Sequence, residues 1–241
     1  MEELRKIDVG EPEIVSGLYT HEVLKKIGRI KDIRRRLKVY SALGEDIDHK
    51  EHYGNLSARI NSKEFICTAT QTSGLPEIEL RLKHFPLVTD FRDGLIYWRG
   101  EKETQKPSVE SSTHDGFYRG NSRIMYVAHG HLQSLYDHYQ DRPHEALVWD
   151  LEITYGSPEI RRKALEDGLN PLMLGHDSPY GSWGLVIPRG HFNAFFIVGE
   201  SPKAIQYGFL RAYDSTTFST HNTITEEFTD LENSPVYAED I

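Results

Sequence analysis

The sequence lacks several features that mark secreted, membrane-bound or repetitive proteins. It has one cysteine in 241 residues, Cys67, so no intramolecular disulfide can form. Cys67 stands in an apolar segment where a buried core thiol is the usual role. No apolar run approaches the roughly 20 residues that a membrane-spanning helix needs, and the first residues lack the apolar core of a secretory signal. We also find no internal repeat, and we expect a cytoplasmic protein.

Basic residues are also fewer than acidic ones. The chain carries 28 Lys and Arg against 37 Asp and Glu, for a formal net charge of -9. Binding to nucleic acid needs a basic footprint for the phosphates, so we expect no nucleic-acid partner, and we expect no membrane partner either. A small anionic substrate remains compatible with this charge. The length, with 38% hydrophobic and 27% charged residues, predicts one soluble globular domain.

The first regular element predicted is an amphipathic helix from about residue 19 to residue 38. Its apolar residues recur every three or four positions. Basic residues, Arg34 and Lys38 among them, cover its other sides. These residues could form a face for an acidic partner, but we interpret them as a solvated helix surface whose long side chains cover apolar neighbours.

Hairpins alternate with helices along the rest of the chain. Asp93-Gly94 between two apolar runs is a strong hairpin signal, and Ser157-Pro158 and Ser201-Pro202 have the cap-and-proline pattern that begins a helix. This alternation predicts a largely antiparallel sheet covered by helices. We divide the chain into an irregular N-terminal arm (1–17), one domain (18–215) and an acidic C-terminal surface tail (216–241).

Candidate metal ligands lie between residues 107 and 131. His129 and His131 follow an apolar strand-like run, so both imidazoles would leave the same face of a strand. With 12 histidines in the chain, such a pair is by itself a weak indication, and two half-exposed strand histidines would look the same. Glu110 and His114 are four apart, which places them on one face of a helix that begins near Ser108. Together these residues could bind a zinc-type cation.

Five motifs in order give the chain a resemblance to a known family. It resembles the class II aldolase/adducin family from about residue 20 to residue 215. Each motif is loose by itself, but the order of all five is specific. The motifs are Gly54-Asn55-Leu56-Ser57-Ala58-Arg59, Thr72-Ser73-Gly74, Pro107-Ser108-Val109-Glu110 with His114, His129-Gly130-His131, and Val186-Ile187-Pro188-Arg189-Gly190-His191.

The resemblance implies a fold and a metal site. The fold would be α/β, a three-layer α/β/α sandwich around a mainly antiparallel sheet. Glu110, His129, His131 and His191 would bind Zn²⁺ or another divalent metal, and Glu110 would also transfer a proton. His114 would orient Glu110 or a ligand without binding the metal itself, or would merely pack. Without the resemblance, we would interpret His191 as a histidine in a surface turn.

The resemblance also implies a substrate-binding or phosphate-binding loop set. The matching positions are Gly54, Asn55, Ser73, Gly74 and Ser108. One departure concerns Val109, which stands where the phosphate-binding aldolases usually have a second serine. Valine cannot donate a hydrogen bond, so the substrate is either unphosphorylated or held by other groups. In a second departure, Phe192 replaces the glycine that usually follows the last ligand.

The function implied is that of a metal-dependent aldolase, an aldehyde-lyase of carbohydrate metabolism. It would cleave or form a hydroxylated ketose or sugar phosphate through a metal-stabilised enediolate. An epimerase or dehydratase on the same scaffold is an alternative, and so is a non-catalytic adducin-like binding protein, although adducin-type domains lose the metal ligands that this chain retains. The resemblance also implies a homotetramer, with a tyrosine as proton donor that we cannot assign among 13 tyrosines.

Overall fold

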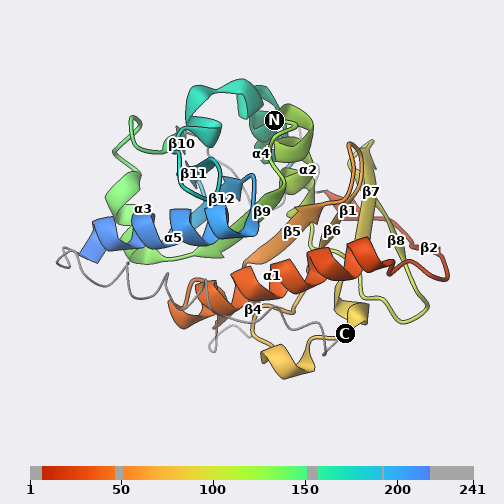
Figure 1. Ribbon diagram of the computed structural model, residues 1–241. Coiled ribbons are helices and arrows are strands. Elements are labelled where there is room, and N and C mark those ends of the chain that lie inside the picture. The colour runs from red at the N-terminus through yellow and green to blue at the C-terminus, as the bar shows by residue number, and fades with distance from the viewer. Residues whose placement is uncertain (1–6, 47–50, 151–156, 192, 218–241) are drawn as a thin grey trace.

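The computed structural model describes residues 7–46, 51–150, 157–191 and 193–217. Among these residues, ten strands form one sheet that helices cover on both faces, and β3 and β4 form a separate pair (Figure 1). The strands are β1 (Asp8–Val9), β2 (Glu13–Ile14), β3 (Gly44–Asp46), β4 (Glu51–Tyr53), β5 (Asn55–Arg59), β6 (Phe65–Cys67), β7 (Leu87–Arg92), β8 (Leu95–Gly100), β9 (Tyr126–His131), β10 (Leu147–Trp149), β11 (Trp183–Pro188) and β12 (Ala194–Gly199).

Three helices begin near residues 20, 158 and 202, where the sequence predicted them, whereas the helix predicted to begin near Ser108 begins at Ser111. Thr20 caps the first, since its side chain accepts a hydrogen bond from the Val23 amide at 3.4 Å. Pro158 occupies the first turn of the fourth, where a missing amide hydrogen costs nothing. The α-helices are α1 (His21–Val39), α2 (Ser111–Gly120), α3 (Gln133–Tyr139), α4 (Pro158–Glu166) and α5 (Pro202–Thr217).

The sheet is mainly antiparallel, as expected. Its strand order is β1-β8-β7-β6-β5-β9-β12-β11-β10, with β2 also paired to β8. The parallel pairs involve the short strands β1, β2 and β10 at its ends, and all other pairs in this sheet are antiparallel. We expected residues 1–17 to form an irregular arm, yet β1 and β2 lie within that range. The arm is therefore partly an edge of the sheet.

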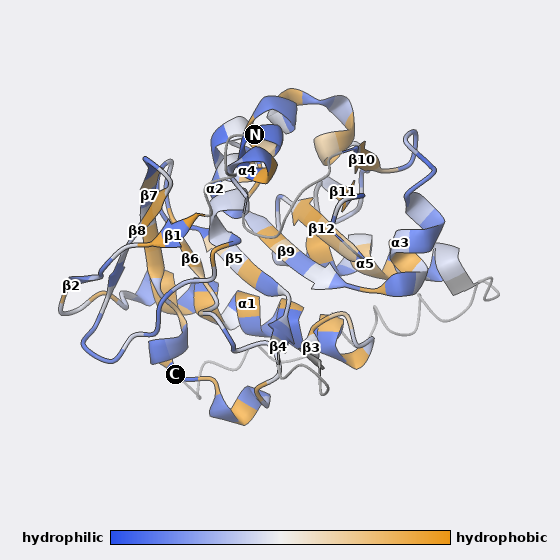
Figure 2. Cartoon of the chain, turned by 180° about the vertical axis from the view of Figure 1, so that it is seen from behind, coloured by the Kyte–Doolittle hydropathy of each residue, from blue (hydrophilic) through white to orange (hydrophobic). Residues whose placement is uncertain are grey.

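Two apolar cores separate the three layers. One core lies between the sheet and the helices α1, α3 and α5, and includes Ile30 and Phe209. The other lies between the sheet and the helices α2 and α4, and includes Phe117 and Ile160. Figure 2 shows hydrophobic and hydrophilic residues in alternation along α1, as an amphipathic helix requires. The α/β/α sandwich predicted from the sequence is confirmed.

One basic residue of α1 corrects our interpretation of that helix as a solvated surface. The side chain of Arg34 is only 1% exposed and forms an ion pair with Glu77. Its Nη2 donates hydrogen bonds to the carbonyl oxygens of Thr72 and Ser73, at 3.0 and 2.9 Å. Lys38 donates to the next carbonyl, that of Gly74, at 3.2 Å. The cations of α1 therefore hold the backbone of the loop at residues 72–75.

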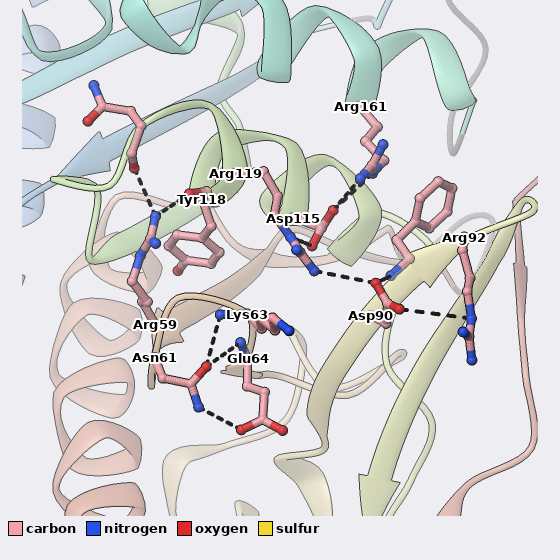
Figure 3. Close-up of polar contacts among 12 residues, drawn as sticks. Arg59, Asn61, Lys63, Glu64, Asp90, Arg92, Asp115, Tyr118, Arg119 and Arg161 are labelled. Atoms are coloured by element: carbon pink, nitrogen blue, oxygen red, sulfur yellow. Dashed lines mark hydrogen bonds and ion pairs between the residues drawn. The ribbon is translucent and has the colours of Figure 1, made fainter.

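A buried carboxylate fixes helix α2 against helix α4. Asp115, which is 1% exposed, accepts two hydrogen bonds from Arg161 at 3.0 and 2.6 Å and one from Arg119 at 3.1 Å. Figure 3 shows Asp115 between these two arginines. At Gly116, a Cβ would lie 2.4 Å from the Arg161 carbonyl oxygen, so only glycine permits this close approach. The position of α2 determines where Glu110, at its N-terminus, lies.

Two further expectations concern the C-terminal end of the chain. The acidic tail assigned to residues 216–241 lies almost entirely outside them, so it stays a prediction. Helix α5 continues to Thr217, slightly past the boundary that we assigned to the domain. None of the described helices is both long and apolar enough to span a bilayer.

Candidate metal centre

Four candidate ligands meet from three parts of the fold. His129 and His131 extend from β9, which lies between β5 and β12 in the middle of the sheet. His191 belongs to the turn between β11 and β12, and Glu110 is the N-cap residue of α2. The three histidines each offer a ring nitrogen, and these nitrogens all lie within 4.8 Å of one another.

The carboxylate of Glu110 closes this group. Its Oε2 lies 2.7 Å from Nδ1 of His129, and its Oε1 lies 3.7 Å from Nε2 of His191. The Nε2 atoms of His131 and His191 are 3.2 Å apart. The structure therefore brings together all four residues that the resemblance named as ligands.

The donor set fits a divalent cation. His129 is fully buried, and its Nε2 has no hydrogen-bond partner among the described residues. A buried polar group without a partner costs about 1–3 kcal/mol, so such a nitrogen is seldom left without a ligand. Three imidazoles with a neighbouring carboxylate are ligands that zinc accepts, and three protein ligands leave a position open as in catalytic zinc sites.

Burial favours the neutral form of two of the three imidazoles, those of His129 and His191. It lowers the pKa of His129 to about 3 and the pKa of His191 to about 4, with the Glu110 carboxylate partly offsetting the shift of His191. Burial also raises the pKa of Glu110 above its usual range, and the nearby His191 and His131 oppose this change. Because a cation binds only unprotonated imidazole, the two histidines are competent ligands throughout the neutral range.

These shifts predict how the stability of the metal-free protein depends on pH. The pKa of a histidine in the unfolded chain is about 6.5. As the pH falls from about 6.5 to about 4, His129 and His191 therefore become protonated in the unfolded chain but stay unprotonated in the folded chain. The free energy of unfolding should fall by roughly 1.4 kcal/mol per pH unit for each such proton. The raised pKa of Glu110 acts in the opposite direction. The lowered pKa of the buried His114 adds to the loss.

Urea unfolding of chelator-treated protein at about pH 7 and about pH 5 measures this dependence. The variant His129→Gln/His191→Gln should show a smaller loss of stability between the two pH values, because glutamine does not titrate and only the contribution of His114 and the other titrating groups remains. An equal loss in the variant and the wild type would show that these histidines are not the groups responsible.

His114 lies in a buried polar chain beside the site. Its Nδ1 is 2.7 Å from Oγ of Ser57, which in turn is 2.7 Å from the hydroxyl of Tyr118. Burial lowers the pKa of His114 well below its usual value. Among the described residues its side chain makes no hydrogen bond to Glu110. These contacts fit a packing role, and its part in orienting a ligand stays a prediction.

Two of the proposed substrate positions contact the ligands themselves. Gly54 has a φ of +86°, and a Cβ there would lie 2.8 Å from the carbonyl oxygen of His129, so the turn into β5 requires glycine. Asn55 lies opposite His129 across the β5–β9 pair, and its Nδ2 donates to Oε2 of Glu110 at 2.7 Å. Asn55 therefore holds the carboxylate, and its contact with substrate stays a prediction.

The other three proposed substrate positions donate to or accept from protein groups. The Ser73 hydroxyl donates to the carbonyl of Gly54, and the Gly74 amide donates to Nδ1 of His52 at 2.8 Å. Oγ of Ser108 accepts from the amide of Glu110 at 3.3 Å. An anion would have to displace the acceptors of Ser73 and Gly74, whereas the Ser108 hydroxyl keeps its hydrogen for a further partner. The binding of phosphate by this set stays a prediction.

Sequence reasoning did not identify three neighbours of the site. Phe196 stacks on His129 with ring centroids 4.6 Å apart, and the ring of Tyr53 lies 5.6 Å from that of His131. Oδ1 of Asn193 lies 2.8 Å from Nδ1 of His131. Only the strand register reveals the first contact, since Phe196 pairs with His129 across β12 and β9. Phe192, which stands in place of the glycine that usually follows the last ligand, lies outside the described residues.

No protein-family model matches the chain, and no curated protein matches it either. Solved structures do. YgbL from Klebsiella pneumoniae is similar with a TM-score of 0.57 and 15% identity, over 85% of this chain and 93% of that one. A sugar-phosphate aldolase from Thermotoga maritima is similar with a TM-score of 0.54 and 14% identity, over 90% of this chain and 100% of that one. An aldolase II superfamily protein from Pseudomonas syringae is similar with a TM-score of 0.52 and 12% identity, over 92% of this chain and 91% of that one.

The chain has the class II aldolase fold. The resemblance that the five motifs carried is thereby confirmed at the level of structure. The class II aldolase fold alone does not determine an activity, because one scaffold can carry different chemistries. The function must therefore be argued from the four ligands and their surroundings.

Proposed function

We propose that this protein is a divalent-metal-dependent enzyme, with zinc as the metal, acting on a small hydroxylated sugar or sugar phosphate as an aldolase. The observation that supports this most is the group of His129, His131, His191 and Glu110, three of them buried, on the class II aldolase fold. The similar structure from Thermotoga maritima is named a sugar-phosphate aldolase, which agrees with this substrate class.

The three histidines would hold the cation. When bound there, a divalent cation supplies a Lewis acid that draws negative charge toward a substrate carbonyl oxygen. The protein prepares this site in advance, because His129 and His191 are buried and burial favours their neutral form. Electrostatic stabilisation is strongest where the groups need not reorganise during the reaction.

Glu110 would move the proton at the carbon beside that carbonyl. Its Oε2 is fixed by the Asn55 amide at 2.7 Å. Its Oε1, which lies 3.7 Å from His191 Nε2, faces the cluster. The carboxylate is buried beside the candidate ligands, where it could take a proton from a carbonyl compound held at the cation.

Other activities share the same ligands. An epimerase or a dehydratase would also use a cation and a proton-transferring carboxylate. An adducin-like binding protein would need none of these groups, so the intact ligand set favours an enzyme. The homotetramer and the cytoplasmic location stay predictions.

A panel of ketoses, each supplied with and without a terminal phosphate, tests the proposal. The zinc-loaded protein is incubated with each compound, and the products are identified by NMR spectroscopy. Release of an aldehyde and a smaller carbonyl compound supports the aldolase. Inversion at one carbon without aldehyde release would assign an epimerase, and loss of water would assign a dehydratase. No turnover of any compound would contradict the enzyme proposal.

A further inference from the structure

The turn between β11 and β12 places an asparagine against a candidate ligand. Asn193, two residues after His191, has a φ of +48°, in the left-handed region. Its carbonyl oxygen accepts a hydrogen bond from the Leu132 amide at 2.8 Å. Its side-chain Oδ1 lies 2.8 Å from Nδ1 of His131. The backbone and the side chain of Asn193 thus contact two consecutive residues at the end of β9.

The contact with His131 specifies where the imidazole proton lies. A carbonyl oxygen can only accept a hydrogen bond, so Nδ1 of His131 must carry the proton in this contact. In a neutral imidazole, the other nitrogen is then an unprotonated acceptor. That nitrogen, Nε2, faces Nε2 of His191 at 3.2 Å, inside the ligand cluster.

We propose that Asn193 is a positioning residue that fixes His131 in the Nδ1–H tautomer and so presents its Nε2 as a ligand. The part of this proposal that concerns the cation rests on the proposed function. The tautomer does not, because the hydrogen bond is present in the protein without a metal. A partner on the second nitrogen is what orients metal-binding histidines in general.

Asparagine combines two requirements at this position. The left-handed backbone favours glycine, asparagine and aspartate. Of these, glycine has no side-chain acceptor, whereas aspartate offers an acceptor of the same length. Asn193→Gly therefore removes the hydrogen bond while keeping the turn, and Asn193→Asp keeps both. Asp93→Gly is a matched control, since Asp93 is an exposed turn residue with a φ of +54°.

Nitrogen-15 NMR spectroscopy of the metal-free protein reports the tautomer of His131 directly. The wild type and Asn193→Asp should both show the proton on Nδ1. Asn193→Gly should shift the proton toward Nε2, and Asp93→Gly should match the wild type. A wild-type His131 protonated on Nε2 would overturn the proposal, as would an unchanged tautomer in Asn193→Gly. If Asn193→Gly does not fold, an Asn193→Asp protein protonated on Nε2 overturns it equally.

Titration with cobalt or zinc tests the consequence for the cation. Asn193→Gly should bind about 10- to 100-fold more weakly than the wild type. Asn193→Asp should bind at least as tightly as the wild type, and Asp93→Gly should bind equally. Equal affinity in the wild type and Asn193→Gly would contradict the role of Asn193 in presenting the ligand. Absence of binding in the wild type, with the tautomer as predicted, would instead overturn the proposed metal function alone.

Discussion

Glu110→Gln is expected to lower the exchange of substrate protons by about 10²- to 10⁴-fold, the usual contribution of a positioned acid or base. Glutamine keeps the shape of the side chain and can still accept the hydrogen bond that Asn55 donates at 2.7 Å. It cannot take a proton from carbon. Incubation of the zinc-loaded protein with dihydroxyacetone or its phosphate in heavy water, followed by NMR spectroscopy, measures this exchange.

The zinc content of the same variant separates the two roles of Glu110. Retained zinc with lost exchange would assign the carboxylate to proton transfer, whereas loss of both would assign it to the cation. Glu22→Gln, in the exposed first turn of α1, is the control and should leave exchange unchanged. Normal exchange in Glu110→Gln would rule out its role as the acid or base.

Arg34→Met is expected to destabilise the fold by about 1–3 kcal/mol, the cost of leaving buried hydrogen-bonding groups without a partner. The side chain is 1% exposed, and its loss would remove the hydrogen bond that it donates to the Ser73 carbonyl and its ion pair with Glu77. Urea unfolding followed by circular dichroism measures the change.

Arg35→Met is the matched control, because the neighbouring Arg35 side chain is 56% exposed. It should change the stability by less than about 0.5 kcal/mol, as surface substitutions usually do. If both variants lost a similar amount of stability, the buried contacts of Arg34 would not stabilise the fold more than an exposed arginine does.

The elements of the fold could largely be predicted because each has a local signal. The period of the apolar residues marks α1, the Asp93-Gly94 pair marks the β7–β8 hairpin, and Pro158 marks the start of α4. The candidate ligands could be predicted because residues i and i+2 of a strand share a face, which fixes His129 and His131 together. Their convergence with His191 and Glu110 followed only from the resemblance.

The rest depends on neighbours that lie far away in the sequence. The burial of Arg34 depends on a loop some forty residues later, with which it forms hydrogen bonds. The partner of His114 is Ser57, on a strand that the helix happens to cover. Residues 8–9 join the sheet only because the backbone of β8 is available at its edge. None of these contacts has a periodic or turn signal that a single sequence could show.

The metal content of the purified protein tests the central claim most directly. Elemental analysis should be made on untagged wild type after dialysis against zinc, and on His129→Ala/His131→Ala. The control is His21→Ala/His144→Ala, which removes two exposed histidines, so that both double variants have the same number of histidines. We predict close to one zinc per chain in the wild type and the control, and none in a folded His129→Ala/His131→Ala protein. A wild type that stays metal-free, or a double variant that keeps its zinc, would contradict the account.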